Sequence, residues 1–248
     1  MGQAGPVIAG DRAWDQGRAK RMVSKVLEVE GNKSRPWNRI PWRTSAVNAA
    51  KEARQTGKPV FIFFYLEGSA PSVESSCLEG RLLRTHVLSD PAVLAFIKAR
   101  CVPVKVKLAK DKEFPLDWPA LDRWVTTFKF RAGKGLAGCS VVSADLEIEY
   151  GNSGSANLWE LFESRAYNSG SFAAMLEQAA LRITEERSLR VQRGISDFER
   201  KMELRTFRRG VRKAVRSQHD SRLPPRGYSL ERAMELQQMA GAVEKPAG

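Results

Sequence analysis

The stretch KPVFIFFYL, residues 58–66, contains the longest apolar run of this chain, Val60 to Leu66. From Pro59 to Tyr65 apolar side chains occupy positions on both faces of an extended strand, so this segment is predicted to be a strand buried on both sides. Such a strand lies in the middle of a sheet that helices cover. The stretch that follows, SAPSVESSCLEG at residues 69–80, leaves the end of this strand, where α/β proteins commonly place binding and catalytic groups.

The segments around this strand alternate between helical and extended patterns. Ser45 can cap a helix that Gly57 ends, and Ser89-Asp90-Pro91 is a strong helix start. Further helices are predicted at Leu78 to about His86, at Pro119–Phe128, and over a long stretch that Ser171 caps. The other predicted strands are Cys101–Leu108, Cys139–Ser143 and Leu146–Tyr150.

The order of these elements predicts the sheet. Strands joined through a helical crossover run parallel, whereas two strands joined by a tight turn such as Ala144-Asp145 form an antiparallel hairpin. The expected fold class is therefore α/β, with a mixed central sheet between two layers of helices.

Two phrases of the sequence then resemble a known family. A helix ending in GKP leads into the strand VFIFFY, and SDPAV precedes the strand CVPVKVKL. Together they resemble the thioredoxin-like superfamily, in particular its bacterial members, over residues 42–187. On this basis residues 1–41 are interpreted as an N-terminal arm, and residues 188–248 as a basic helical extension and tail.

The resemblance implies a CxxC motif at the start of the helix after the first strand, where the helix dipole lowers a thiol pKa. Counting back from Ser89-Asp90-Pro91 places Cys77-Leu78-Glu79-Gly80 there, with Glu67–Ser76 as a lengthened loop. Cys77 would then be a thiol without its partner, because Gly80 occupies the second position. It is interpreted either as a reactive nucleophile or as a small half-buried residue beside Glu74 and Glu79.

Two further features that the resemblance implies are changed. The segment before the third strand ends in Ala137-Gly138, without the family's cis-proline, and the usual acid of the first strand falls at Phe63. Ala137 and Gly138 are kept as candidate binding residues that face Cys77. The motif is thus a degenerate CxxC, and redox catalysis is not the first expectation.

Other candidate sites are weaker. Cys101 and Cys139 fall in strands and are interpreted as core residues, and His86 as a structural residue. Gly133-Lys134-Gly135 lacks the frame of a phosphate-binding loop. With two His and no CxxC pair, no metal site and no cofactor are predicted.

Charge and targeting signals say more about partners and location than about fold. The net charge of the chain is +13, and residues 187–216 hold 11 Lys and Arg against three acidic residues. No signal peptide and no membrane-spanning run are visible, and the three cysteines are widely spaced. These features favour a soluble protein in the reducing cytoplasm.

The basic segment carries two apolar stripes. Val191, Ile195, Phe198 and Met202 form one, and Leu204, Phe207, Val211 and Val215 form a second that is out of phase with it. A bend, a break near Gly210 or two docking surfaces would explain the change of phase. The segment is either packed back on the domain, or a basic face for nucleic acid or an acidic protein, or a contact with an anionic membrane surface. The candidate binding residues are Arg205, Arg208, Arg209, Arg212 and Lys213.

Three functions follow from these patterns. The first is a thioredoxin-like binding or scaffold module that has lost redox activity and holds a protein partner. The second is a monothiol thiol–disulfide oxidoreductase or thiol sensor that uses Cys77. The third is a nucleic-acid-associated protein that binds through residues 187–216.

Overall fold

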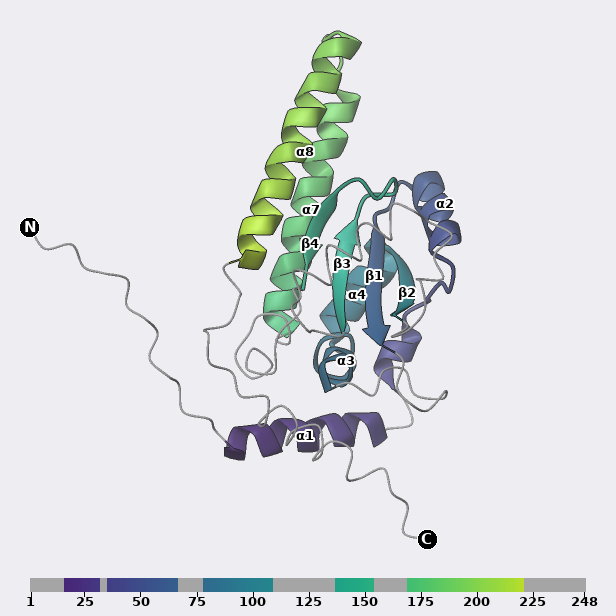
Figure 1. Ribbon diagram of the computed structural model, residues 1–248. Coiled ribbons are helices and arrows are strands. Elements are labelled where there is room, and N and C mark those ends of the chain that lie inside the picture. The colour runs from purple at the N-terminus through teal and green to yellow at the C-terminus, as the bar shows by residue number, and fades with distance from the viewer. Residues whose placement is uncertain (1–15, 32–34, 67–77, 109–136, 154–168, 221–248) are drawn as a thin grey trace, which may run out of the picture.

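The computed structural model describes residues 16–31, 35–66, 78–108, 137–153 and 169–220 (Figure 1). The helix expected at Pro119–Phe128 and the loop expected at Glu67–Ser76 lie outside these ranges. The elements are α1 Gln16–Gly31, η1 Pro36–Arg39, α2 Ala46–Thr56, β1 Val60–Leu66, α3 Leu78–Leu82, η2 Leu83–Val87, α4 Pro91–Arg100, β2 Val102–Leu108, β3 Ala137–Val142, β4 Glu149–Asn152, α7 Ser169–Val191 and α8 Asp197–Asp220.

The four strands form one mixed sheet in the order β2-β1-β3-β4. β1 runs parallel to β2 and antiparallel to β3, and β3 runs antiparallel to β4. The predicted mixed α/β sheet is therefore confirmed. Phe63 lies at the centre, paired with Lys105 of β2 on one side and Cys139 of β3 on the other.

The hairpin turn is longer than predicted, because β4 begins at Glu149 instead of Leu146. Leu146 has a left-handed backbone with φ 59°. The Asp145 carboxylate accepts hydrogen bonds from the Ser143 hydroxyl and from the backbone N–H of Glu147, at 3.2 Å for the latter. These local bonds hold the chain in a turn and replace the expected strand pairing.

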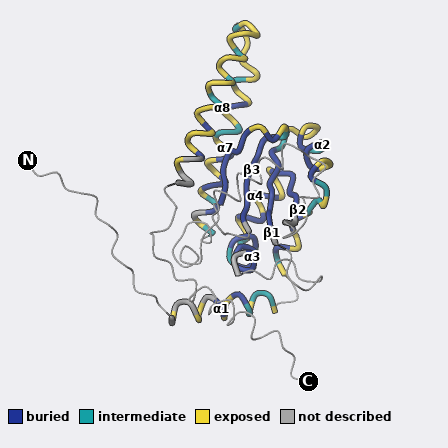
Figure 2. The backbone as a smooth tube through the Cα atoms, viewed as in Figure 1, coloured by how far each residue is buried: buried dark blue, intermediate teal, exposed yellow. Residues whose placement is uncertain are grey.

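Helices cover both faces of the sheet (Figures 1 and 2). On one face the alanines of α2 pack against Val60, Ile62 and Phe64. On the other face Phe61 and Phe63 belong to a larger core that includes side chains of α1, η2, α4, α7 and α8. Phe61, Ile62 and Phe63 are at most 1% exposed, so the prediction that this strand is buried on both faces is confirmed.

The helix boundaries follow their capping residues. The Ser45 hydroxyl accepts a hydrogen bond from the Asn48 N–H, and Gly57 ends α2 with φ 66°. The Asp90 carboxylate accepts hydrogen bonds from the N–H groups of Ala92 and Val93, with Pro91 in the first turn of α4. Both predicted starts are confirmed, and each cap supplies an acceptor for N–H groups that the helix itself leaves unpaired.

Arg43 lies at the outer edge of β2. Arg43 forms a parallel bridge with Val104. Its N–H donates to the Pro103 carbonyl at 2.9 Å, and its carbonyl accepts from the Lys105 N–H at 3.1 Å. The backbone groups of this edge are therefore partly paired within the chain.

The first helix is part of the core, and this differs from the expected arm at residues 1–41. Val23 and Val26 of α1 are buried. At the end of α1 the Glu30 carboxylate lies 2.7 Å from the Arg81 guanidinium and 3.1 Å from that of Arg84. Both arginines are buried, and Arg84 stacks over the Trp37 ring at 5.9 Å. α1 is thus fixed to α3 and η2 by a half-buried ion-pair cluster.

The second difference concerns the C-terminal segment. α7 continues to Val191, past the expected boundary at residue 187, and the chain turns at Gly194, where φ is 93°. A break near Gly210 was one of three alternatives for the change of phase, but Gly210 lies within α8. Ser196 and Glu199 start α8 as a capping box: the Glu199 N–H donates to the Ser196 hydroxyl, and the Ser196 N–H donates back to the Glu199 carboxylate.

The two apolar stripes differ in burial, and the change from the first to the second lies within α8, after Met202. The second stripe docks on the domain, where Val211 and Val215 are buried in the main core and Phe207 packs against it. The first stripe stays outside, since Val191 is 70% and Phe198 73% exposed. α7 and α8 form a hairpin that extends past the sheet beside β4 (Figures 1 and 2). Within the described residues, no helix is long and apolar enough to cross a membrane.

The first stability prediction concerns Phe63. Phe63→Ala should lower the free energy of unfolding by about 3–5 kcal/mol, because it removes buried apolar surface and leaves a cavity. Val47 of α2 is 38% exposed, so Val47→Ala should change the free energy of unfolding by less than about 0.5 kcal/mol. Urea denaturation monitored by circular dichroism measures both. Equal effects of the two variants would contradict the central position of β1.

A second prediction tests whether α1 belongs to the folded domain. Glu30→Ala should destabilise the chain by about 1.5–3 kcal/mol, because it removes the carboxylate that binds two buried guanidinium groups and fixes α1 to them. The matched control is Glu28→Ala, two residues away, which removes only an exposed pair with Lys25 and should cost less than about 1 kcal/mol. Indistinguishable unfolding curves for the two variants would show that α1 is an arm.

Candidate functional site

The helix after β1 begins where the counting from Ser89-Asp90-Pro91 placed it. α3 starts at Leu78, so Cys77 directly precedes it in sequence, and Gly80 is buried within the helix. α3 and η2 together run from Leu78 to Val87, close to the predicted Leu78 to about His86. Cys77 itself lies outside the described residues, and its reactivity stays a prediction.

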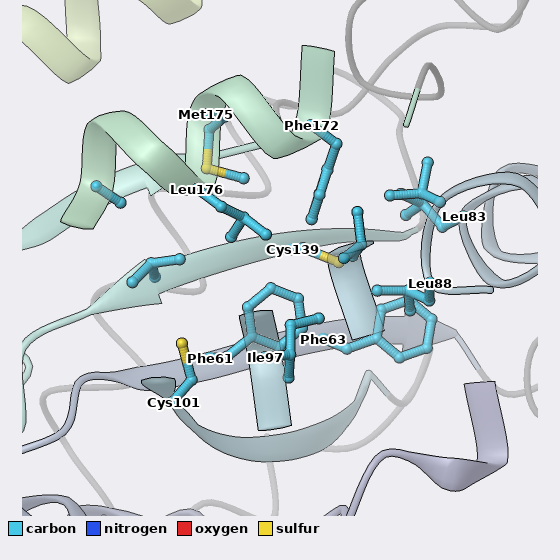
Figure 3. Close-up of a cluster of buried hydrophobic side chains, with 14 of the residues drawn as sticks. Phe61, Phe63, Leu83, Leu88, Ile97, Cys101, Cys139, Phe172, Met175 and Leu176 are labelled. Carbon is cyan, nitrogen blue, oxygen red and sulfur yellow. The ribbon is translucent and has the colours of Figure 1, made fainter. Parts of the chain in front are cut away.

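The position that the resemblance assigns to a buried acid is apolar. Phe63 is 1% exposed, and its backbone pairs with that of Cys139. Figure 3 shows the Cys139 sulfur among apolar side chains that include Phe63, Phe172 and Leu176. No proton acceptor stands at this position, because a phenylalanine side chain cannot accept a proton.

Ala137 and Gly138 lie inside a strand, whereas the sequence suggested a segment before it. β3 begins at Ala137, and these two residues pair with Tyr65 and Phe64 of β1. Gly138 is buried. The backbone groups of Ala137 and Gly138 therefore take part in sheet pairing with β1. Fewer of these groups are left to bind a peptide than the sequence-based candidate site required.

The two described cysteines are core residues, as predicted. Both are free thiols in the main core. Burial raises the pKa of Cys101 to about 12 despite the nearby Lys58 and Arg100, and burial raises the pKa of Cys139 far above its ordinary value. Both thiols stay protonated at neutral pH, so they lack the thiolate that nucleophilic chemistry requires.

His86 has a structural contact. Its Nδ1 lies 2.9 Å from the Thr85 hydroxyl, at the end of η2. Burial, together with the positive charge of Lys25, lowers the pKa of His86. Among the described residues no group of three or more His, Cys, Asp or Glu side chains could hold a metal ion.

The five basic residues predicted to bind a partner divide into two groups. Arg205, Arg209 and Lys213 are exposed, and none of them forms an ion pair with another described residue. Lys201 extends this row by one more position with the same spacing of four. Residues four apart lie on one side of a helix, about 6 Å apart along its axis, so the four cations form one row along the outside of α8.

Arg208 and Arg212 instead face the domain. The Arg208 guanidinium lies 2.8 Å from the Glu186 carboxylate and 3.1 Å from that of Asp145. Arg212 donates to the Glu147 carbonyl at 3.1 Å and lies 3.7 Å from its carboxylate. Arg208 is therefore a structural residue, in contrast to the predicted binding role, and Arg212 is partly engaged.

Glu186 is the centre of this contact. Its side chain is 3% exposed and accepts hydrogen bonds from the Tyr150 hydroxyl at 2.6 Å, from Arg190 at 2.7 Å and from Arg208 at 2.8 Å. Burial alone would raise the pKa of Glu186, but these three hydrogen bonds outweigh it and keep the pKa below its ordinary value. Burial and the bond to Glu186 raise the pKa of Tyr150.

Two comparisons with known proteins bear on this site. Neither a family model nor a curated protein sequence matches this chain. The candidate site is therefore defined by the residues of this chain alone: the exposed row on α8, and the ion-pair cluster beneath it.

The cluster around Glu186 makes a pH-dependent prediction. The pKa values of Glu186 and Asp145 are lowered in the folded state, so both carboxylates stabilise the fold above their unfolded values of 4.5 and 3.8. That stabilisation is lost as the pH falls below this range. Arg208→Met should therefore cost about 1.5–3 kcal/mol at neutral pH and clearly less at acid pH, where the two carboxylates become protonated.

Urea denaturation of the wild type and of Arg208→Met, each at neutral and at acid pH, measures how the cost of the substitution depends on pH. The exposed neighbour supplies the matched control: Arg209→Met removes the same charge and should cost less than about 0.5 kcal/mol at either pH. A cost of Arg208→Met that is the same at both pH values would show that Glu186 and Asp145 play no part in it.

Proposed function

We propose that this chain is a thioredoxin-like binding module without redox catalysis, which holds an acidic protein partner on the outer face of α8. The sheet order supports the thioredoxin-like assignment. β1 and β2 are parallel and are joined through helices. The β3–β4 hairpin follows, with β3 antiparallel to β1, and α7 comes after it. This is the succession of elements that the sequence resemblance implied.

The chemistry around β1 supports a binding role over catalysis. The position of the family's acid is Phe63, the second cysteine position is Gly80, and the two described thiols are buried with raised pKa values. A dithiol cycle needs a resolving thiol and a proton acceptor, and these positions supply neither.

The observation that carries the proposal is the composition of the outer face of α8. Phe198 and Met202 are 73% and 44% exposed. They precede Arg205 and Arg209 by seven residues, which is nearly two helical turns, and so lie on the same side of the helix. The acidic Glu203 lies about 100° or more round the helix from these four residues, whereas Glu199 lies about 60° from Met202 and borders this side. The face is therefore basic and apolar at once.

This combination favours a protein over a nucleic acid. Aromatic residues, Met and Arg are enriched in the centres of protein–protein interfaces, and exposed Met side chains adapt to different partners. A nucleic acid would need the cations alone, or several aromatic side chains on which bases stack. The expected partner thus offers carboxylates around an apolar side chain.

The binding prediction uses an amphipathic acidic peptide as its probe. Reversing three charges, in Lys201→Glu/Arg205→Glu/Arg209→Glu, should weaken its binding at least about tenfold, because like charges would then face each other. Phe198→Ala should weaken it about fivefold or more if Phe198 lies at the centre of the contact. Fluorescence anisotropy at several salt concentrations measures both effects.

The control reverses three exposed charges elsewhere, at Arg39, Lys51 and Lys98, and should leave the affinity within about twofold. A short DNA duplex serves as the competing probe. The chain could instead bind the duplex more tightly than the peptide, with an affinity that Phe198→Ala does not change. That result would contradict a protein partner and favour nucleic acid.

A separate prediction concerns redox activity. The full-length chain should not reduce insulin above background in a dithiol-coupled turbidity assay, because the positions of the second thiol and of the acid are Gly80 and Phe63. Turnover that disappears in Cys77→Ser would contradict the binding-module proposal and support a monothiol oxidoreductase.

A further inference from the structure

A cleft of about 330 Å³ opens where α2, the β3–β4 turn and α7 meet. Ala53 and Pro59 line one wall and Ile183 the other, while Tyr150 and Glu186 also border it. Tyr150 and Glu186 are 5% and 2% exposed, so they lie deep in the cleft. Its volume is at the lower end of the range for small-molecule sites, and its apolar walls leave room for a compact ligand.

The charges around this cleft do not balance. Its two carboxylates, Asp145 and Glu186, are already matched by guanidinium groups, since Arg190 and Arg208 bind Glu186, and Arg208 also reaches Asp145. Burial alone would raise the pKa of Asp145, but hydrogen bonds from Ser143, the Glu147 N–H and Arg208 keep it low. Both carboxylates are thus ionised and paired at neutral pH.

Three further cations line the cleft: Arg54, Lys58 and Arg187. Arg54 donates to the Ala144 carbonyl at 3.4 Å, and Arg187 donates to the Gly57 carbonyl. These acceptors are neutral, and none of the three cations forms an ion pair with a described carboxylate. The cleft therefore carries a surplus of three positive charges, from α2, from the loop between α2 and β1, and from α7.

One feature opposes an anion here. The carboxyl end of α2 points its carbonyl groups toward this region, and a helix C-terminus repels negative charge. Arg187 offsets this effect because its guanidinium donates to Gly57 at that end of the helix. The remaining donors of Arg187 and those of Lys58 are then available to a ligand.

We infer that this cleft binds a small multivalent oxyanion, of the phosphate or polycarboxylate class. Arg54, Lys58 and Arg187 supply its positive charge, and Ala53 and Ile183 contact its apolar part. The lining of the cleft includes no residue of the outer face of α8.

Isothermal titration calorimetry on the full chain tests this site, with pyrophosphate and citrate as the two probes at constant ionic strength. At least one of them should bind saturably with a Kd of about 1 mM or below. Saturable binding of one probe and not the other assigns the ligand class. Heats that do not saturate for either probe, or that equal those of sodium chloride, would overturn the inference.

Variants then locate the binding. Lys58→Gln/Arg187→Gln should weaken it at least about tenfold, because two charge-assisted contacts are lost. Lys58→Gln alone should weaken it severalfold while its unfolding curve stays that of the wild type, so a folding defect at the end of α2 is recognised separately. Arg193→Gln, which removes one exposed cation from the α7–α8 turn, should leave the affinity unchanged.

The triple reversal Lys201→Glu/Arg205→Glu/Arg209→Glu separates this inference from the proposed function. It should leave probe binding to the cleft within about twofold, since these residues do not line it. Binding that is lost in the triple variant and kept in Lys58→Gln/Arg187→Gln would place the anion on α8 and contradict a site in the cleft.

Discussion

The structure depends on one constraint, the complete burial of β1. This strand has a hydrogen-bonded neighbour on each edge and helices on each face, so none of its described side chains from Val60 to Phe64 reaches water. Apolar side chains are the only ones that fit such a strand without an added polar partner. Phe63 meets this constraint with an apolar side chain, so its position offers no proton acceptor. The packing that fixes the sheet thus also decides against proton transfer at its centre.

A second dependence joins the domain to its C-terminal helix. Glu186 of α7 is buried and ionised, and a buried carboxylate is tolerated only with several donors around it. Two of its donors, Tyr150 and Arg190, come from β4 and from α7 itself, and the third, Arg208, comes from α8. Together with Val211 and Val215 in the core, this contact fixes α8 to β4. The cations of α8 that point away from the domain are therefore held in a fixed row.

The sequence predicted what depends on local pattern. The buried strand, the parallel and antiparallel pairings, and the caps at Ser45 and Asp90 all follow from short runs of residues. The predicted arm failed as a description of α1, because its anchor is a contact between Glu30 and Arg81, 51 positions apart. Arg208 was predicted to bind a partner together with its neighbours on α8 for a similar reason. Its ion-pair partner Glu186 is 22 positions away, and a local pattern does not reveal such a contact. The capping box Ser196-x-x-Glu199 could have been found from sequence, and it would have favoured a helix start at this point over a break near Gly210.

The bridge between Arg43 and Val104 has a consequence for self-association. An open sheet offers unpaired backbone groups at its two outer strands, where another chain can add a strand. Here the backbone of Arg43 occupies part of the β2 edge, where Pro103 also lacks an N–H to donate. At the opposite edge α8 packs against β4. Both borders of the described sheet are therefore partly covered, which disfavours the addition of a strand from another copy of the chain at Arg43 and along β4.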